Sequence, residues 1–166
     1  LPVLQKAFLD ARFVSGGLLE ERGAESLRRG GHTQVGIFYK FKRRADFFKA
    51  DKTFSRAELG QDDRPLILSS GGSLGAEPIN KAIVELITAK APAGDCCFIH
   101  ATGHSGTWVS DELKNRGVDP ESFENVTIRE YIDDMSRCMS ACDIFINRAG
   151  ASTLSEIQAL GKPSIL

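Results

Sequence analysis

From residue 62 onward, hydrophobic and polar residues follow one repeating order along the chain. A short apolar run leads into a corner rich in Gly or Ser, then an amphipathic stretch, then the next apolar run. The apolar runs predict strands at residues 65–70, 96–100, 125–128, 143–147 and 163–166. The amphipathic stretches predict helices at residues 76–90, 106–116, 131–141 and 153–160.

Strands that alternate with helices indicate a parallel sheet, because parallel neighbours need long crossover connections. We therefore predict an α/β fold with a doubly wound parallel sheet over residues 61–166. Residues 1–60 are less regular, and we interpret them as an N-terminal segment and linker that ends in a short helix at 53–59. The last strand stops at Leu166 without a covering helix, so we expect the domain to be truncated at its C-terminal end.

The composition is typical of a soluble globular protein, with 42% hydrophobic and 26% charged residues in 166. The net charge of -1 excludes an overall field that would favour nucleic acid or an anionic membrane. No apolar run approaches the roughly 20 residues of a membrane span, and the first residues lack the pattern of a secretory signal. We therefore expect an intracellular chain with no nucleic-acid partner.

The cysteines and histidines do not form a recognisable metal site. The four cysteines fall into two pairs, Cys96 with Cys97 and Cys138 with Cys142. Neither pair has the spacing of a zinc knuckle, so we predict that all four are buried as small apolar residues. We interpret His100 and His104 as loop residues, because no carboxylate motif completes a site around them, and we predict no metal.

The first corner that could carry chemistry is LILSSGGSLGAEPINKAI. Gly71 and Gly72 permit a tight turn, Ser73 offers a hydroxyl, and a helix begins after Gly75. The free amides and the positive dipole of that helix N-terminus could hold an anion. The alternative is a glycine-rich corner without a ligand, since the spacing matches neither the GxGxxG nor the Walker motif.

The second corner is NRAGASTLSE, where Arg148 follows an apolar strand. One interpretation is a capping box, in which Glu156 turns back onto the amide of Thr153. The other is a ligand site, in which Glu156 accepts two hydrogen bonds from a ribose while Thr153 and the preceding amides hold a diphosphate. Ligands of open parallel sheets lie outside the carboxyl ends of the strands, so both corners would face one crevice.

A third stretch, VTIREYIDDMSRCMSACD, passes from a strand into a helix. Ile132 lies at the transition, where its backbone amide and carbonyl could read the edge of a base. We interpret Asp133 and Asp134 as caps of the following helix rather than as metal ligands. The basic run at residues 40–44 is interpreted as a solvated surface.

Taken together, SSGGSLGAEPINKAI and EYIDDMSRCMSACDIFINRAGASTLSEIQALGKPSIL closely resemble the C-terminal half of the MurG family of bacterial cell-wall glycosyltransferases. The three corners occur in the family's order and spacing. The resemblance implies the truncated C-terminal, Rossmann-like domain of a GT-B glycosyltransferase. The implied reaction is inverting transfer of N-acetylglucosamine from UDP-N-acetylglucosamine to a lipid-linked muramyl-pentapeptide, converting lipid I to lipid II in peptidoglycan synthesis. The implied location is the cytoplasmic, inner face of the cell membrane, in peripheral contact with it, and no cofactor is implied.

Carried over by resemblance, the substrate-binding residues are Arg44, Ser73, Ile132, Ala151, Ser152, Thr153 and Glu156. Ser73 would lie near the nucleotide, Ile132 would contact uracil through its backbone, and Glu156 would hold the ribose hydroxyls. Ala151, Ser152 and Thr153 would surround the diphosphate. Arg44 departs from the family pattern, because Phe-Lys-Arg precedes it where the family has Gly-Asn-Pro-Val.

The resemblance leaves the catalytic residues unassigned. The family's acceptor-binding N-terminal domain and its paired sugar-binding glutamines have no counterpart in these residues, so we expect the fragment alone to bind UDP weakly and to be inactive. Two alternatives remain open. The chain could belong to another GT-B transferase that acts on a lipid or sterol, or it could be a noncatalytic nucleotide-binding module.

Overall fold

The computed structural model describes residues 51–166, with the side chain of Ala151 left aside. Strands and helices alternate along this part of the chain, as the sequence pattern predicts. The elements are α3 (Lys52–Glu58), β1 (Leu66–Ser70), α4 (Glu77–Lys90), η4 (Ala91–Ala93), β2 (Cys97–Ala101), η5 (His104–Gly106), α5 (Val109–Asn115), β3 (Val126–Arg129), α6 (Met135–Ala141), β4 (Ile144–Asn147), α7 (Ala151–Leu160) and β5 (Ser164–Ile165).

The five strands form one sheet in the order β3-β2-β1-β4-β5, and every neighbouring pair is parallel. Strand β1 lies at the centre, where Ser70 is opposite Ala101 of β2 on one side and Asn147 of β4 on the other. The predicted doubly wound parallel sheet is therefore confirmed for these residues.

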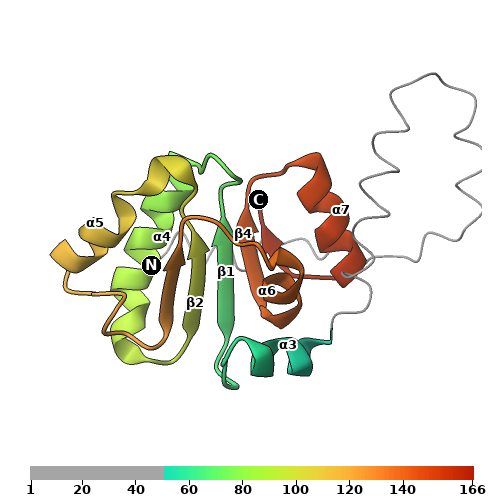
Figure 1. Ribbon diagram of the computed structural model, residues 1–166, viewed down its shortest axis with the longest axis horizontal. Helices are drawn as coiled ribbons and strands as arrows, with labels where there is room; N and C mark the ends of the chain where they lie inside the picture. The colour runs from blue at the N-terminus through green and yellow to red at the C-terminus, as the bar shows by residue number, and fades with distance from the viewer. Residues whose placement is uncertain (1–50) are drawn as a thin grey trace, which may run out of the picture.

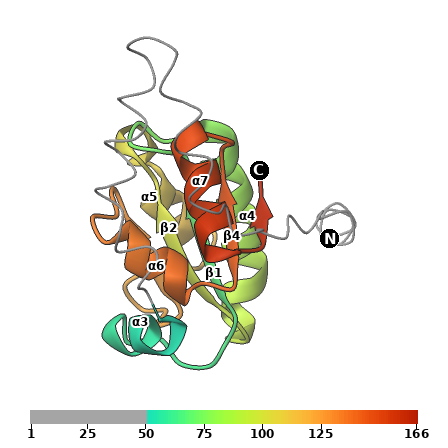
Figure 2. The ribbon, with the colours of Figure 1, turned by 90° about the vertical axis from the view of Figure 1, so that its right-hand side faces the viewer.

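Helices cover both faces of the sheet, so the domain has three layers (Figures 1 and 2). On one face, α4 and α5 bury a cluster that includes Ile83, Phe98 and Leu113. On the other face, α6 and α7 bury a second cluster that includes Met139, Phe145 and Ile157. The central strands are apolar on both sides because both faces are covered, as is usual in parallel sheets.

Helix α3 packs against α6 at the amino ends of the strands, at the bottom of Figure 1. Its first turn is capped by Asp51, whose carboxylate accepts a hydrogen bond of 2.8 Å from the amide of Phe54. Leu59, just after the helix, packs against the core cluster of α6 and α7. The predicted boundary at residue 60 stays a prediction, since most of the first segment lies outside the described residues.

Helix boundaries differ from the predicted ones by two or more residues at three corners. The second helix begins at Val109 rather than at residue 106, because residues 104–106 form the 3₁₀ turn η5. The third helix begins at Met135 rather than at residue 131, because residues 133–134 form a turn whose Asp134 carbonyl accepts the amides of Arg137 and Cys138. Helix α7 begins at Ala151, two residues earlier than predicted. Among residues 51–166, no helix has both the length and the apolar character that crossing a membrane requires.

Candidate functional site

The two glycine-bearing corners lie side by side at the carboxyl end of the sheet. They follow β1 and β4, which are hydrogen-bonded neighbours with Ser70 opposite Asn147. The chain leaves β1 toward α4 on one face and leaves β4 toward α7 on the other. This is the point at which the winding of a doubly wound sheet reverses, and it is where open parallel sheets bind their ligands.

The first corner is a tight turn that presents backbone and a hydroxyl to solvent. We call residues 71–75 the glycine turn. The amide of Gly75 donates to the carbonyl of Gly72 over 2.9 Å, and both glycines have a φ of +86°, which disfavours any other residue. Ser73 lies exposed at its tip, as its predicted role near a nucleotide requires. Helix α4 then starts at Glu77 without a side-chain hydrogen bond from its N-cap, Ala76.

The second corner turns directly from β4 into α7, and its N-cap is Gly150. Helix α7 therefore begins with Ala151, Ser152 and Thr153, whose amides belong to a first turn without a side-chain cap. The amide of Leu154 is the first to bond within the helix, donating to the carbonyl of Gly150 over 2.9 Å. The three residues predicted to surround a diphosphate thus form one helix N-terminus.

This geometry contradicts the capping-box interpretation of the second corner. A capping box needs Thr153 as N-cap and Glu156 at the third helical position, but Thr153 is itself the third residue of α7 and Glu156 the sixth. The helix starts earlier because Gly150 has the extended backbone of an N-cap, with φ of -77° and ψ of 140°. Glu156 is 7% exposed and is therefore a buried residue of α7.

Arg148 joins the two corners, although sequence reasoning did not include it among the site residues. Its guanidinium lies against the glycine turn, where a Cβ added to Gly72 would be 3.2 Å from Nη2. The Arg148 amide is fixed by the side-chain oxygen of Asn147 at 2.6 Å, while the residue as a whole is exposed. Its position immediately after an apolar strand was the available signal. A cation beside two helix N-termini favours an anionic ligand.

Ile132 reaches the same end of the sheet from β3. The residue as a whole is 3% exposed and belongs to the core cluster that also contains Ile157 of α7. This burial includes the backbone, so the contact of the Ile132 backbone with uracil stays a prediction. The neighbouring Tyr131 is 59% exposed.

The prediction that the side chains of Asp133 and Asp134 cap the following helix is wrong. Asp134 occupies the N-cap position of α6 but makes no side-chain cap bond. Its carboxylate instead pairs with Arg129 at 3.2 Å, at the end of β3. Asp133 is exposed.

The remaining sequence predictions concern the cysteines, the two histidines and Arg44. All four cysteines are buried, as predicted, and burial raises the pKa of the Cys138 thiol to about 12, so it is an unreactive thiol. His104 lies in the 3₁₀ turn after β2, but His100 is a buried residue of β2 rather than a loop residue. Arg44 lies outside the described residues.

His100 is held inside the sheet in its neutral form. Its Nδ1 is 2.8 Å from the Ser69 hydroxyl, and burial lowers the pKa of its imidazole to about 4. Within residues 51–166, no group of three or more His, Cys, Asp or Glu side chains gathers in a way that could hold a metal ion.

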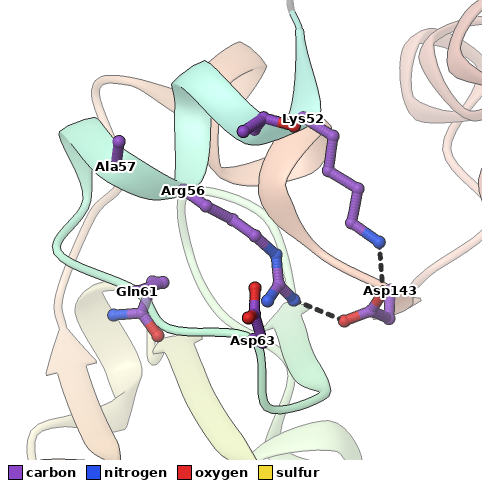
Figure 3. A pocket seen from close by; sticks show the side chains of 7 residues that line it. Lys52, Arg56, Ala57, Gln61, Asp63 and Asp143 are labelled. Atoms are coloured by element: carbon purple, nitrogen blue, oxygen red, sulfur yellow. Dashed lines mark hydrogen bonds and ion pairs between the residues drawn. The ribbon is translucent and has the colours of Figure 1, made fainter.

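A cavity of about 400 Å³ lies at the opposite, amino end of the sheet (Figure 3). Its lining includes Lys52, Arg56 and Asp143, which point toward one another. Arg56 Nη2 is 2.6 Å from the Asp143 carboxylate, and Lys52 also pairs with that carboxylate. Because these charges are already paired with one another, this cavity is a poorer candidate for a ligand than the carboxyl end.

Comparison with known proteins identifies the family to which this chain belongs. Residues 66–166 match the model of the glycosyltransferase family 28 C-terminal domain. A UDP-N-acetylglucosamine--N-acetylmuramyl-(pentapeptide) pyrophosphoryl-undecaprenol N-acetylglucosamine transferase from Caldicellulosiruptor saccharolyticus is 39% identical over 124 residues, which cover 74% of this chain and 32% of that protein. The enzyme of the same name from Bifidobacterium adolescentis is 32% identical over 96% of this chain and 43% of its own length.

A solved structure leads to the same family. The crystal structure of MurG from Acinetobacter baumannii matches with a TM-score of 0.50 and 27% identity, over 72% of this chain and 32% of that one. The chain thus spans between 32% and 43% of the length of these proteins. With its parallel sheet and the family match over residues 66–166, the chain belongs to glycosyltransferase family 28 and carries the family's C-terminal domain.

Proposed function

We propose that this chain is the donor-binding part of a UDP-N-acetylglucosamine-dependent glycosyltransferase. The observation that supports it most directly is the adjacency of the glycine turn and the α7 N-terminus on neighbouring strands β1 and β4. A nucleoside diphosphate needs hydrogen-bond donors for its phosphates and an acceptor for its ribose, and we propose that the α7 amides and Glu156 supply them. The relatives are named as transferases of N-acetylglucosamine to a lipid-linked muramyl-pentapeptide, and we extend that substrate pair to this chain.

In this proposal, the diphosphate accepts hydrogen bonds from the first amides of α7, at Ala151, Ser152 and Thr153. Ser73 belongs to the neighbouring glycine turn, and the guanidinium of Arg148 lies against that turn. Glu156, at the buried side of the corner, accepts hydrogen bonds from the ribose hydroxyls, and the Ile132 backbone reads the uracil. Arg44 is proposed as a further contact on the strength of the resemblance alone.

The proposed reaction is inverting. A hydroxyl of the lipid-linked acceptor forms a bond to the anomeric carbon of N-acetylglucosamine while the bond from that carbon to the UDP oxygen breaks. The charge that develops on the leaving diphosphate is stabilised by the amides of the α7 N-terminus, which are oriented before the reaction begins. The base that takes the acceptor's proton is not identified within residues 51–166. Because the acceptor is lipid-linked, we place the reaction at the inner face of the cell membrane.

Titration of UDP into the purified chain tests the donor site. We expect saturable binding, with nuclear magnetic resonance shifts concentrated in residues 71–75 and 148–156. ADP should bind more weakly, because the backbone of Ile132 reads the base, and pyrophosphate alone should bind more weakly still. Absence of UDP binding, or shifts confined to the amino end, would overturn the proposal. Transfer of N-acetylglucosamine by this chain without another domain would contradict the expectation that it is inactive alone.

A further inference from the structure

The loop after β2 lies directly against the glycine turn. We call residues 102–106 the β2 loop. The amide of His104 donates to the carbonyl of Ser73 over 3.1 Å, and the amide of Ser105 donates to the carbonyl of Leu74 over 3.1 Å. The Ser105 hydroxyl donates to the same Leu74 carbonyl over 2.7 Å. Three hydrogen bonds thus hold the tip of the glycine turn to a neighbouring loop.

The two loops also interlock through their backbones. A Cβ added to Gly103 would lie 2.1 Å from the amide nitrogen of Gly75, and one added to Gly75 would lie 2.3 Å from the carbonyl oxygen of Thr102. Gly103 also has a positive φ of +69°. No side chain separates the two backbones at this point, so any shift of one loop is transmitted directly to the other.

The β2 loop is anchored on its other sides to the β3 segment and to α4. The amide of Thr102 donates to the carbonyl of Arg129, and that of Gly103 to the carbonyl of Glu130, both over 2.9 Å. The Thr102 carbonyl in turn accepts from the buried side-chain amide of Asn80 over 3.0 Å. The β2 loop therefore connects the glycine turn to the segment that leads into Ile132.

We propose that the β2 loop sets the position of the glycine turn relative to the base-reading segment, and that Gly103 and Ser105 are positioning residues of the nucleotide site. Neither residue is assigned a contact with the ligand. The proposal rests on the proposed function for the identity of the ligand. The loop geometry itself is independent of that identity.

A matched pair of glycine substitutions tests the proposal. Gly103→Ala adds a methyl group against the glycine turn, whereas Gly94→Ala adds one at a nearly identical φ of +68° with no atom within 4 Å. The two positions match in φ but differ in ψ, which is 171° at Gly103 and 12° at Gly94, so Gly103→Ala adds backbone strain as well as the contact between the loops. Ser105→Ala leaves the backbone conformation unchanged and therefore separates the two contributions. We expect Gly103→Ala to weaken UDP binding by about tenfold or more, and Gly94→Ala to change it by less than about twofold.

Amide hydrogen exchange provides a readout that does not depend on a ligand. In Gly103→Ala, the amides of residues 71–75 and 104–105 should exchange faster, while those of β4 and α6 keep the rates seen in Gly94→Ala. If Gly103→Ala does not fold, Ser105→Ala replaces it, with an expected two- to fivefold weakening of UDP binding that Ser105→Thr restores.

The outcomes separate this proposal from the proposed function. If the wild-type chain does not bind UDP, the proposed function fails, and exchange alone decides whether the β2 loop positions the glycine turn. The positioning proposal is overturned if the folded Gly103→Ala or Ser105→Ala variant shows wild-type exchange in the glycine turn. It is equally overturned if UDP binds to wild type and to these variants with the same affinity.

Discussion

The two ends of the same sheet use charged and polar groups in opposite ways. At the amino end, two cations satisfy the last carbonyls of α6, where Arg56 donates to Ala141 over 3.1 Å and Lys162 to Ser140 and Cys142 over 2.6 and 2.7 Å. At the carboxyl end, α4 and α7 begin without any side-chain cap bond from their N-cap residues. One end is closed by its own side chains, while the other presents helix dipoles to solvent.

If the carboxyl end binds the donor as proposed, the two ends divide stability and binding between them. The charged groups at the amino end neutralise one another and stabilise the fold, so few of their hydrogen-bonding positions remain for a ligand. At the carboxyl end, the amides of α7, the exposed Ser73 and Arg148 can be satisfied by an anion. The five predictions below test this division, beginning with the largest expected effect.

The largest effect should come from removing the anchor of the amino end. Arg56 is 9% exposed and donates to three carbonyls, those of Asp62, Arg64 and Ala141, as well as to the Asp143 carboxylate. Arg56→Met should lower the free energy of unfolding by about 3–5 kcal/mol, measured by urea denaturation, because it leaves buried acceptors unpaired. Lys52→Met, whose side chain is 48% exposed, is the control and should cost less than about 1 kcal/mol. UDP affinity of the folded Arg56→Met variant should be unchanged, and a large loss of affinity would break the division between the ends.

Acidification should destabilise the protein through His100. Its folded pKa of about 4 lies below the ordinary value of 6.5, so the unfolded state binds more protons between these values. Stability should therefore fall as the pH drops from about 6.5 toward 4, by on the order of 2–3 kcal/mol in total. Urea denaturation at a series of pH values measures this loss. His100→Gln should remove most of the slope in that window, and an unchanged slope would show that another group is responsible.

The Asp143 carboxylate should add a separate loss at lower pH. Burial alone would raise its pKa, but Lys52, the Leu66 amide and Arg56 together hold the pKa below its ordinary value. Its contribution is present above the unfolded pKa near 3.8 and is lost as the pH falls below it. Acid unfolding would thus affect first a residue inside the sheet and then the amino end.

Glu156→Gln tests whether the buried carboxylate serves the ligand. We expect UDP binding to weaken by about 1–3 kcal/mol, measured by calorimetric titration, because the carboxylate accepts ribose hydroxyls more strongly than an amide does. The free energy of unfolding should change by less than the binding free energy. Glu85→Gln on the exposed face of α4 is the control and should change neither. A loss of stability that exceeds the loss of affinity would assign Glu156 to the fold instead.

The smallest effect is expected for Thr153→Ala. In the structure, Thr153 lies inside the first turn of α7 and Gly150 is the N-cap. The free energy of unfolding should therefore change by less than about 0.5 kcal/mol, as for an ordinary helix position. A loss of about 1–2 kcal/mol in thermal or urea denaturation would restore the capping-box interpretation, since that is the usual cost of removing an N-cap threonine.

The sequence alone was sufficient to predict the order and type of the elements, and the site that it predicts at their corners stays a prediction. Apolar runs of four to six residues and the glycine-rich corners between them were enough to predict all five strands and the doubly wound sheet. The same corners, together with the motif resemblance, led to the family that the comparison confirmed. These features are local in the sequence, because each strand or turn depends on the residues that compose it.

Only the tertiary structure decided which groups meet. The TLSE pattern in the second corner is compatible with a capping box, and the strand order and the start of α7 at Ala151 were needed to reject it. Gly75 contacts Gly103, and Arg148 contacts the glycine turn. Each contact joins residues that follow different strands. Local patterns in the sequence determine where strands and helices form. Contacts between loops depend instead on strand order and on loop packing across the sheet, which no local pattern encodes.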